Sequence, residues 1–205
     1  MEVMKKPVTD ISDLEALYGT PGPAATDKIA RRMTPEFRVW LERCRFCILS
    51  TVGPEGTDAT PRGDKDPVLR ELDPGTLVLP DWMGNNRIDS LRNIVRDPRA
   101  SLMLFVSGSN NVVRINGRAF VTQDDDLRQS FDVNGKHPRS VIVFEIKEIY
   151  TQCARALMRA GLWEGRDDSE GLPSVGQILA ALTEGRVGGK AYDEEWPERA
   201  AKSMW

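Results

Sequence analysis

The sequence predicts a mainly β protein, with a small antiparallel barrel at its centre and helices around it. The extended segments are short, mostly follow one another directly, and are separated by hairpin-like turns such as Gly53–Gly56. One helix is inserted after the fourth of these segments. A doubly wound parallel sheet would need strands and helices in regular alternation, so the antiparallel barrel fits the pattern better.

The segment that precedes the barrel is predicted to be helical. Ser12–Glu15 has the pattern of a capping box, so a first helix should run to Tyr18. A second helix is expected near Asp27–Arg32. A third should start with Thr34 as its N-cap, because Pro35 then falls in the first turn, where its missing amide hydrogen costs nothing.

The strands are recognised by apolar residues that alternate with polar ones, or that form short runs between turn residues. They are expected at Phe46–Val52, Thr57–Arg62, Val68–Leu72, Thr76–Leu79, Ala100–Val106, Val112–Thr122 and Ser140–Tyr150. Further helices are expected to begin at Asn85–Arg87 and to span Asp124–Phe131, Cys153–Trp163 and Val175–Thr183. In the last strand Val141–Phe144 is apolar on both faces, which predicts a homodimer because a small barrel has little else to cover it.

The stretch Thr76–Asp97 has the features of an anion site. A short apolar strand turns through a Gly-containing loop into Asn85–Arg87, where an Asn can cap a helix. The remaining first-turn amides and the helix dipole attract anions, and the guanidinium of Arg87 suits phosphate oxygens. A second arginine, Arg62, lies upstream in a constrained Pro-Arg-Gly setting. The alternative is an ordinary capped helix that binds nothing, in which Asp89 satisfies the dipole.

Composition excludes several classes of function. The chain has 205 residues and a net charge of −3, which fits one domain and offers no basic stripe for nucleic acid. No apolar run approaches the roughly 20 residues that a membrane span needs. The N-terminal MEVMKKPVTD lacks the apolar core of a signal peptide, so a cytoplasmic location is expected.

Cys44 and Cys47 have the C-x-x-C spacing of redox and metal sites. A second ligand pair is missing, and the lone His137 is distant in sequence. Both cysteines continue apolar segments, so we expect small buried hydrophobes and no metal site. A thiol switch stays open as a lesser alternative.

Four motifs together resemble the pyridoxamine 5′-phosphate oxidase-related proteins, the FMN-binding split-barrel family, in its branch of probable FMN-dependent enzymes. They are FCILSTVGPEGTDATPRGD, TLVLPDWMGNNRIDSLRN, VVRINGRAFV and CARALMRAGLW. The resemblance covers the chain from about Ile11 to Trp163. It implies a six-stranded, Greek-key-like split barrel that forms a homodimer with FMN at each end of the interface. A single domain is then expected, with a helical arm (1–35), a barrel core (36–152) and a helical C-terminal segment (153–205).

The resemblance also implies site residues, position by position. Those expected at the FMN phosphate are Arg62, Asn85, Asn86 and Arg87, with Ser90 nearby. Those expected along the flavin edge are Gly63, Asp64, Pro80 and Asp81. Those expected near the ring from the partner subunit are Arg114 and the turn Asn116–Arg118. Those expected to close the site are Arg155, Arg159 and Trp163.

The function expected is that of an FMN-dependent oxidoreductase with an unknown small substrate. Two departures argue against pyridoxamine phosphate itself: Val112 stands where the true oxidases tend to carry Gln, and their C-terminal substrate-binding segment with Trp and paired Arg has no clear counterpart. The alternatives are a non-catalytic flavin- or haem-binding module and a deazaflavin-dependent reductase on the same fold.

Overall fold

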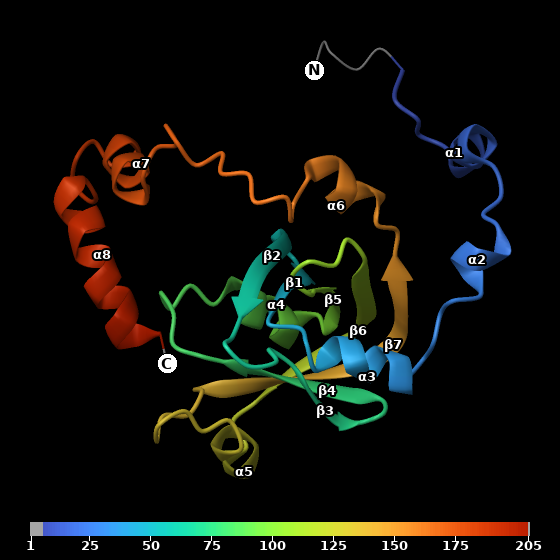
Figure 1. The fold of residues 1–205 in the computed structure, drawn as a ribbon, viewed down its shortest axis with the longest axis horizontal. Helices are drawn as coiled ribbons and strands as arrows, with labels where there is room; N and C mark the ends of the chain where they lie inside the picture. Colours follow the sequence, from blue (N-terminus) through green and yellow to red (C-terminus); the bar gives the residue numbers. More distant parts are fainter. Residues whose placement is uncertain (1–5, 205) are drawn as a thin grey trace.

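Residues 6–204 of the chain are described in a computed structural model, and their centre is one antiparallel sheet (Figure 1). Its strands lie in the order β2-β1-β5-β6-β7-β4-β3. They are β1 (Phe46–Gly53), β2 (Gly56–Gly63), β3 (Arg70–Asp73), β4 (Thr76–Asp81), β5 (Arg99–Phe105), β6 (Val112–Thr122) and β7 (Ser140–Gln152). The mainly β prediction is confirmed, but the sheet has seven strands and not six, because the short β3 pairs with β4. Closure of the sheet into a barrel stays a prediction.

Helices flank the sheet as predicted, although several of them differ in position from expectation. The helices are α1 (Ile11–Tyr18), α2 (Pro23–Thr26), α3 (Pro35–Leu41), α4 (Asp89–Arg96), α5 (Asp125–Gln129), α6 (Arg155–Ala160), α7 (Val175–Leu182) and α8 (Lys190–Ser203). The helix predicted at Asp27–Arg32 is wrong. There Ala30 exchanges two backbone hydrogen bonds with Ile149 of β7, at 2.9 and 2.8 Å, so the chain forms an isolated bridge to the sheet at this point. The long α8 lies in the expected helical C-terminal segment, but its own bounds were not predicted.

The core lies on one face of the curved sheet. Alternation along each strand sends every second side chain inward, and paired residues of neighbouring strands share a face. One row of such neighbours runs from Leu49 through Leu102 and Ile115 to Ile149. All four side chains are buried, and Ile94 of α4 joins the same cluster. α4 therefore covers the inner face, and its C-terminal half contacts the β1–β2 hairpin: Asn93 donates to Thr51, and Arg96 pairs with Glu55.

The doubly apolar part of β7 is covered within the chain. Ile142 and Phe144 face the main core. Val141, on the other face, is buried in a second cluster with Val78 and Phe131, which follows α5. This cover, which the sequence analysis expected from a second subunit, is thus supplied by α5 and the segment after it. The homodimer stays a prediction, and its support comes from the resemblance and no longer from this strand.

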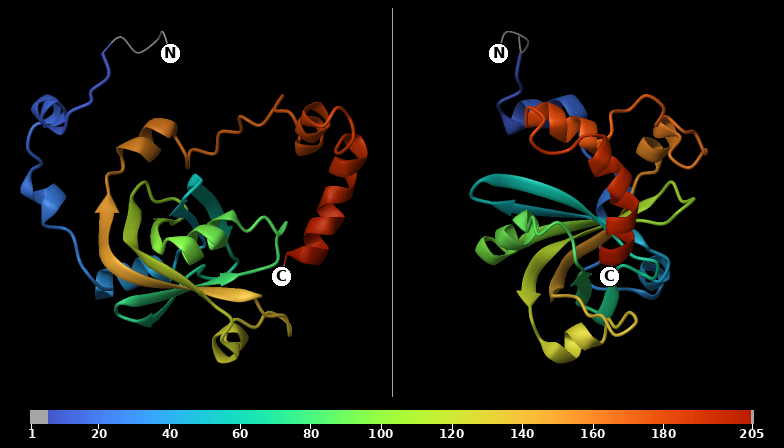
Figure 2. Two further views of the ribbon diagram at one scale, coloured as in Figure 1. Left: turned by 180° about the vertical axis from the view of Figure 1, so that it is seen from behind. Right: turned by 90° about the vertical axis from the view of Figure 1, so that its left-hand side faces the viewer.

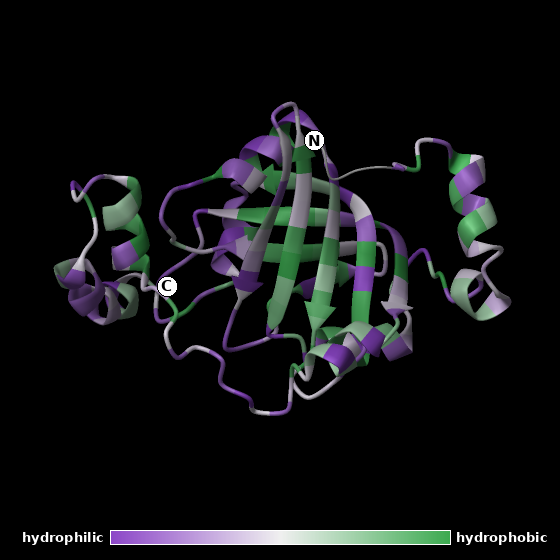
Figure 3. Ribbon diagram, turned by 90° about the horizontal axis from the view of Figure 1, so that it is seen from above, coloured by the Kyte–Doolittle hydropathy of each residue, from purple (hydrophilic) through white to green (hydrophobic). Residues whose placement is uncertain are grey.

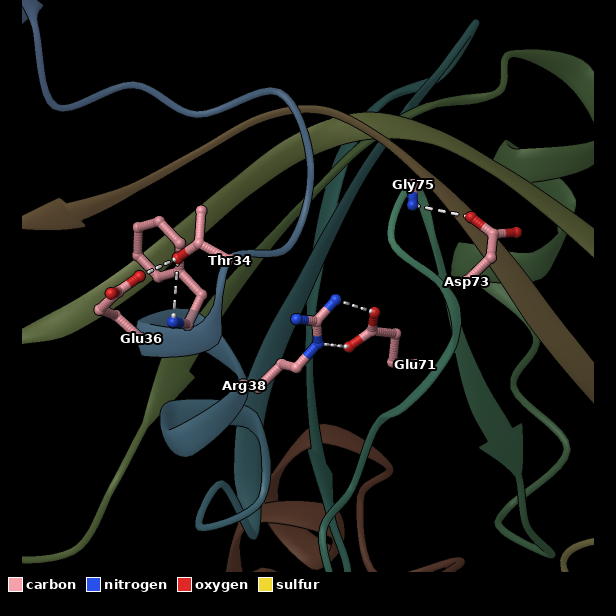
Figure 4. A network of polar contacts seen from close by, with 7 residues as sticks. Thr34, Glu36, Arg38, Glu71, Asp73 and Gly75 are labelled. Carbon is pink, nitrogen blue, oxygen red and sulfur yellow. Dashed lines mark hydrogen bonds and ion pairs between the residues drawn. The ribbon is translucent and has the colours of Figure 1, made fainter.

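Helix α3 is fastened to the edge of the sheet by a polar network (Figure 4). Arg38 forms two hydrogen bonds with the Glu71 carboxylate of β3, from Nε and Nη2, each at 2.7 Å. The Thr34 side chain accepts from the amide of Phe37 at 3.4 Å, which confirms it as the N-cap. The bidentate Arg38–Glu71 pair fixes β3, the short strand that borders β4.

Two helical arms stand away from the sheet on opposite sides (Figures 1 and 2). α1 and α2 form one arm and α7 and α8 the other, and the view in Figure 3 shows the same separation. α7 and α8 are joined to each other: Asp193 accepts hydrogen bonds from Ser174 Oγ at 2.5 Å and from the Gly176 amide at 2.8 Å. None of the helices within residues 6–204 combines the length and apolarity that crossing a membrane requires.

Candidate functional site

The loop Asn85–Arg87 is a turn, and the helix starts after it. The Asn85 side-chain oxygen accepts from the Arg87 amide at 3.0 Å, which is an Asx-type turn. Asn86 has a left-handed backbone, with φ of +61°. α4 begins only at Asp89, and its N-cap residue Ile88 makes no side-chain cap bond. The predicted helix start at Asn85–Arg87 is therefore wrong by a few residues, because Asn side chains can hydrogen-bond to the local backbone in turns as readily as at caps.

Arg87 lies on the surface with an acidic partner. Its Nε is 2.5 Å from Asp89 Oδ2, and its side chain is 80% exposed. This hydrogen bond, and then the charge of Asp89, raise the pKa of Arg87 above its ordinary value. Arg87 lines a hollow of about 280 Å³ together with Asn85, Asn86 and Arg139. It also lines a second hollow of about 320 Å³ beside α4. The sequence alternative assigned Asp89 to the helix dipole, and the side-chain contact observed for Asp89 is with Arg87.

Arg62 is the most enclosed cation of the site. It pairs with Cys47 in the β1–β2 register, so its side chain is on the inner face of the sheet. Its Nη1 is 2.5 Å from Asp81 Oδ1 at the end of β4, and the two side chains are only 19% and 16% exposed. β2 and β4 lie toward opposite ends of the strand order. This ion pair therefore joins two strands that are not hydrogen-bonded to each other. Arg62 Nε is buried and has no acceptor among the described residues.

A hollow of about 430 Å³ opens at Arg62. Its other lining residues include Gly63, Asp64, Pro80, Trp82, Met83 and Met204. Trp82 Nε1 donates to Asp64 Oδ2 at 3.0 Å, which fixes the indole across this region. Trp82 and Met83 also line the hollow at Arg87, and so does Asp81. The two hollows therefore adjoin, with the Arg62–Asp81 pair at their junction.

Of the ten residues expected to bind the cofactor, the structure places eight around the two hollows and leaves Ser90 and Arg114 apart from them. Those around the two adjoining hollows are Arg62, Gly63, Asp64, Pro80, Asp81, Asn85, Asn86 and Arg87. Ser90 is buried within α4. Arg114 is on the outer face of the sheet, where its guanidinium lies 5.4 Å from the Tyr150 ring centre. Within the chain Arg114 and Arg62 are thus on opposite faces of the sheet.

The neighbours of Arg114 have structural roles that the sequence did not indicate. Asn116 Nδ2 donates to Glu148 at 2.6 Å, and a β-bulge lies between Asn116 and Gly117. Of the residues expected to close the site, Trp163 donates from Nε1 to the Ser109 carbonyl at 2.7 Å. That bond ties the end of α6 to the β5–β6 loop, away from the two hollows.

Arg139 is the site residue that sequence reasoning missed. Its Nη1 donates to Asn86 Oδ1 at 2.7 Å, and its amide donates to the Asp81 carbonyl at 3.3 Å. It precedes β7 in a polar loop that carries no anion-binding pattern, so only the three-dimensional fold brings it to Arg87.

The cysteine pair is enclosed in the core. Cys44 and Cys47 are each 0% exposed and are free thiols, whereas Cys153 is exposed. Burial raises the pKa of the Cys44 thiol to about 11 and also raises that of Cys47. Since the thiolate is the reactive form, both are poor nucleophiles, and the predicted role as small buried hydrophobes is confirmed. Among the described residues, no group of three or more His, Cys, Asp or Glu could hold a metal ion.

The sequence of residues 33–153 matches the family model of pyridoxamine 5′-phosphate oxidase. The chain belongs to this family. The match covers more than half of the chain and contains every strand of the sheet, together with α3 and α4. The family named from the motifs is thereby confirmed, and the residues around both hollows fall within the matched segment, apart from Met204 in the C-terminal arm.

Solved structures similar to the pyridoxamine 5′-phosphate oxidase segment are distant in sequence. HupZ from Group A Streptococcus has 14% identity and a TM-score of 0.48, over 58% of this chain and 93% of its own. A Lactobacillus delbrueckii protein named as a candidate pyridoxamine 5′-phosphate oxidase has 23% identity and a TM-score of 0.46, over 59% and 95%. An FMN-binding protein from Syntrophomonas wolfei has 17% identity and a TM-score of 0.42, over 57% and 88%. No curated protein sequence matches the chain. Since each TM-score is below 0.5, family membership rests on the family model.

Proposed function

We propose that this chain is an FMN-dependent oxidoreductase that binds the cofactor along the two adjoining hollows, with Arg62 and Arg87 directed to its phosphate. The observation that carries the proposal is the buried Nε of Arg62, which has no acceptor among residues 6–204, on a residue that lines the 430 Å³ hollow. An unsatisfied buried donor costs about 1–3 kcal/mol, and more when it is charged. A bound anion would remove that cost.

The lining of the hollows fits a ligand with one charged end and one planar apolar part. Pro80, Trp82 and Met83 give the Arg62 hollow apolar walls. The neighbouring hollow offers Arg87 and the polar turn Asn85–Asn86. FMN has a doubly charged phosphate and a large aromatic ring, so both sets of residues would be used. The bound flavin supplies the redox chemistry, while the chain binds it, orients it and excludes water.

Titration of purified protein with FMN and with riboflavin tests this proposal. Both ligands contain the same ring, but only FMN carries a phosphate. We expect FMN to bind more tightly, and Arg87→Ala to weaken FMN binding by about 10- to 100-fold while riboflavin binding is unchanged. Arg99→Ala is the matched control, since Arg99 is also exposed and also paired with an aspartate two residues away, Asp97. Equal losses for both ligands, or no binding of either, would overturn the proposal.

The dimer is part of the same proposal. Arg114 lies on the outer face of the sheet, so it can reach a flavin only if a second copy brings that face to the hollows. We therefore expect a dimer in light scattering, and a loss of FMN affinity in Arg114→Ala without a change in oligomeric state. A monomer that binds FMN fully would contradict this part and leave the cofactor assignment intact.

Three related functions are separated by two measurements. Rapid reduction of bound flavin by NADH or NADPH and reoxidation by an acceptor supports the oxidoreductase. Bound flavin that exchanges electrons only slowly with every donor tried indicates a carrier or sensor. Mass analysis of the chromophore released from the protein distinguishes FMN from a deazaflavin or haem.

A further inference from the structure

We infer that Arg139 is a third phosphate-binding arginine of this site, beside Arg62 and Arg87, and that Asn86 sets its orientation. This inference rests on the proposed function, because it assigns a residue to the phosphate end of the same site. Arg139 lies 52 residues after Arg87 in the chain and outside the motifs that identify the family segment. The fold brings it to the wall of the 280 Å³ hollow that Arg87 also lines.

Hydrogen bonds hold both the backbone and the guanidinium of Arg139. Its amide donates to the Asp81 carbonyl at 3.3 Å, which places its backbone beside the end of β4. Its Nη1 donates to Asn86 Oδ1 at 2.7 Å, which fixes the guanidinium against the turn. An arginine has five N–H donors, and the bond to Asn86 uses one of them. The planar group is thus oriented before any ligand arrives, and donors remain for phosphate oxygens.

Asn86 has a backbone that glycine would adopt more easily. Its φ of +61° lies in the left-handed region, which Asn tolerates better than most residues. A glycine would give the same turn without the carboxamide. The turn itself therefore does not require the Asn86 carboxamide. The contact that this carboxamide makes is the hydrogen bond that it accepts from Arg139.

The charges around the hollow favour a second cation. Arg87 already contacts Asp89, so part of its charge is neutralised before a ligand binds. Among residues 6–204 no ion pair joins Arg139 to a carboxylate; its recorded side-chain bond goes to a neutral amide. A phosphate monoester carries close to two negative charges at neutral pH. Arg139 supplies the positive charge that the Arg87–Asp89 pair does not.

The experiment compares FMN and riboflavin binding in Arg139→Gln and in a matched control. Lys136→Gln removes one positive charge from the same exposed loop without touching the hollow. We expect Arg139→Gln to weaken FMN binding by about 10- to 100-fold, to leave riboflavin binding unchanged and to make FMN binding less dependent on salt. Lys136→Gln should change FMN binding by less than about twofold. Arg139→Lys should fall between wild type and Arg139→Gln, because it keeps the charge and loses the fork.

Asn86→Gly tests the orienting role, since it keeps the backbone conformation and removes the contact to Arg139. We expect a several-fold loss of FMN affinity that disappears when Arg139→Gln is already present. If wild-type protein prefers FMN over riboflavin and Arg139→Gln keeps that preference unchanged, the inference fails while the proposed function stands. If wild-type protein shows no such preference, the proposed function itself fails. Thermal melting of each apo variant shows whether a loss of binding reflects a loss of folding.

Discussion

The Arg62–Asp81 pair gives the sharpest test of what joins β2 to β4, two strands that are not neighbours in the sheet. Arg62→Met keeps the apolar stem of the side chain and leaves the Asp81 carboxylate without its partner. Exposed ion pairs contribute about 0.2–1 kcal/mol, whereas removing one member of a fully buried pair costs about 3–5 kcal/mol. With side chains 19% and 16% exposed, this pair lies between the two limits. We expect a loss of about 2–3 kcal/mol in the free energy of unfolding.

Urea denaturation of apo protein, followed by circular dichroism, measures this loss. In thermal unfolding, the melting temperature of Arg62→Met should be roughly 5–10 °C below that of the wild type, for a chain of this size. The double variant Arg62→Met, Asp81→Leu should recover most of the stability, because it leaves no unpaired charge. If Arg62→Met changes the free energy of unfolding by less than about 0.5 kcal/mol, or if the two substitutions simply add, the pair does not hold β2 to β4.

Three further predictions concern other parts of the fold. Gly117→Ala should cost about 3 kcal/mol or more in urea denaturation, because its Cβ would lie 2.0 Å from a backbone oxygen of β7; Gly22→Ala, with open space around it, should be neutral. Iodoacetamide should modify Cys153 in native protein but reach the buried C-x-x-C pair only after denaturation, as intact mass would show. The side chain of Arg99 lowers the pKa of Asp97 from its ordinary 3.8 to about 2, so this contact should stabilise the fold above pH 4 and be lost as pH falls toward 2. Asp97→Asn should therefore flatten the decline in stability over that range, and an unchanged decline would assign it to other carboxylates.

The sequence predicted the strands well because their signals are local. Apolar alternation and turn residues placed β1, β2, β5, β6 and β7 to within about two residues of their observed bounds. The helix start at Asn85–Arg87 was less accurate, since an Asn followed by a polar residue fits a cap and an Asx turn equally well. The geometry that decides between them, the left-handed Asn86 held by Arg139, involves a residue from a distant loop.

Contacts between distant segments also explain the other differences. Nothing in Asp27–Arg32 indicates that it bridges to β7, because its partner Ile149 lies more than a hundred residues later. The segment after α5 covers Val141, although its sequence shows only a short capped helix. The length of α8 was missed because its polar, weakly patterned sequence contains Pro197 within the helix. Propensity alone does not place such an element.

The central claim is that the two adjoining hollows hold a flavin by its phosphate. The most direct measurement is to denature the purified protein, or protein reconstituted with a mixture of FMN, riboflavin, deazaflavin and haem, and to identify the released molecule by mass. The account predicts FMN in preference to riboflavin and the others, and a loss of that preference in Arg87→Ala. Release of haem or deazaflavin, or equal retention of FMN and riboflavin, would contradict it.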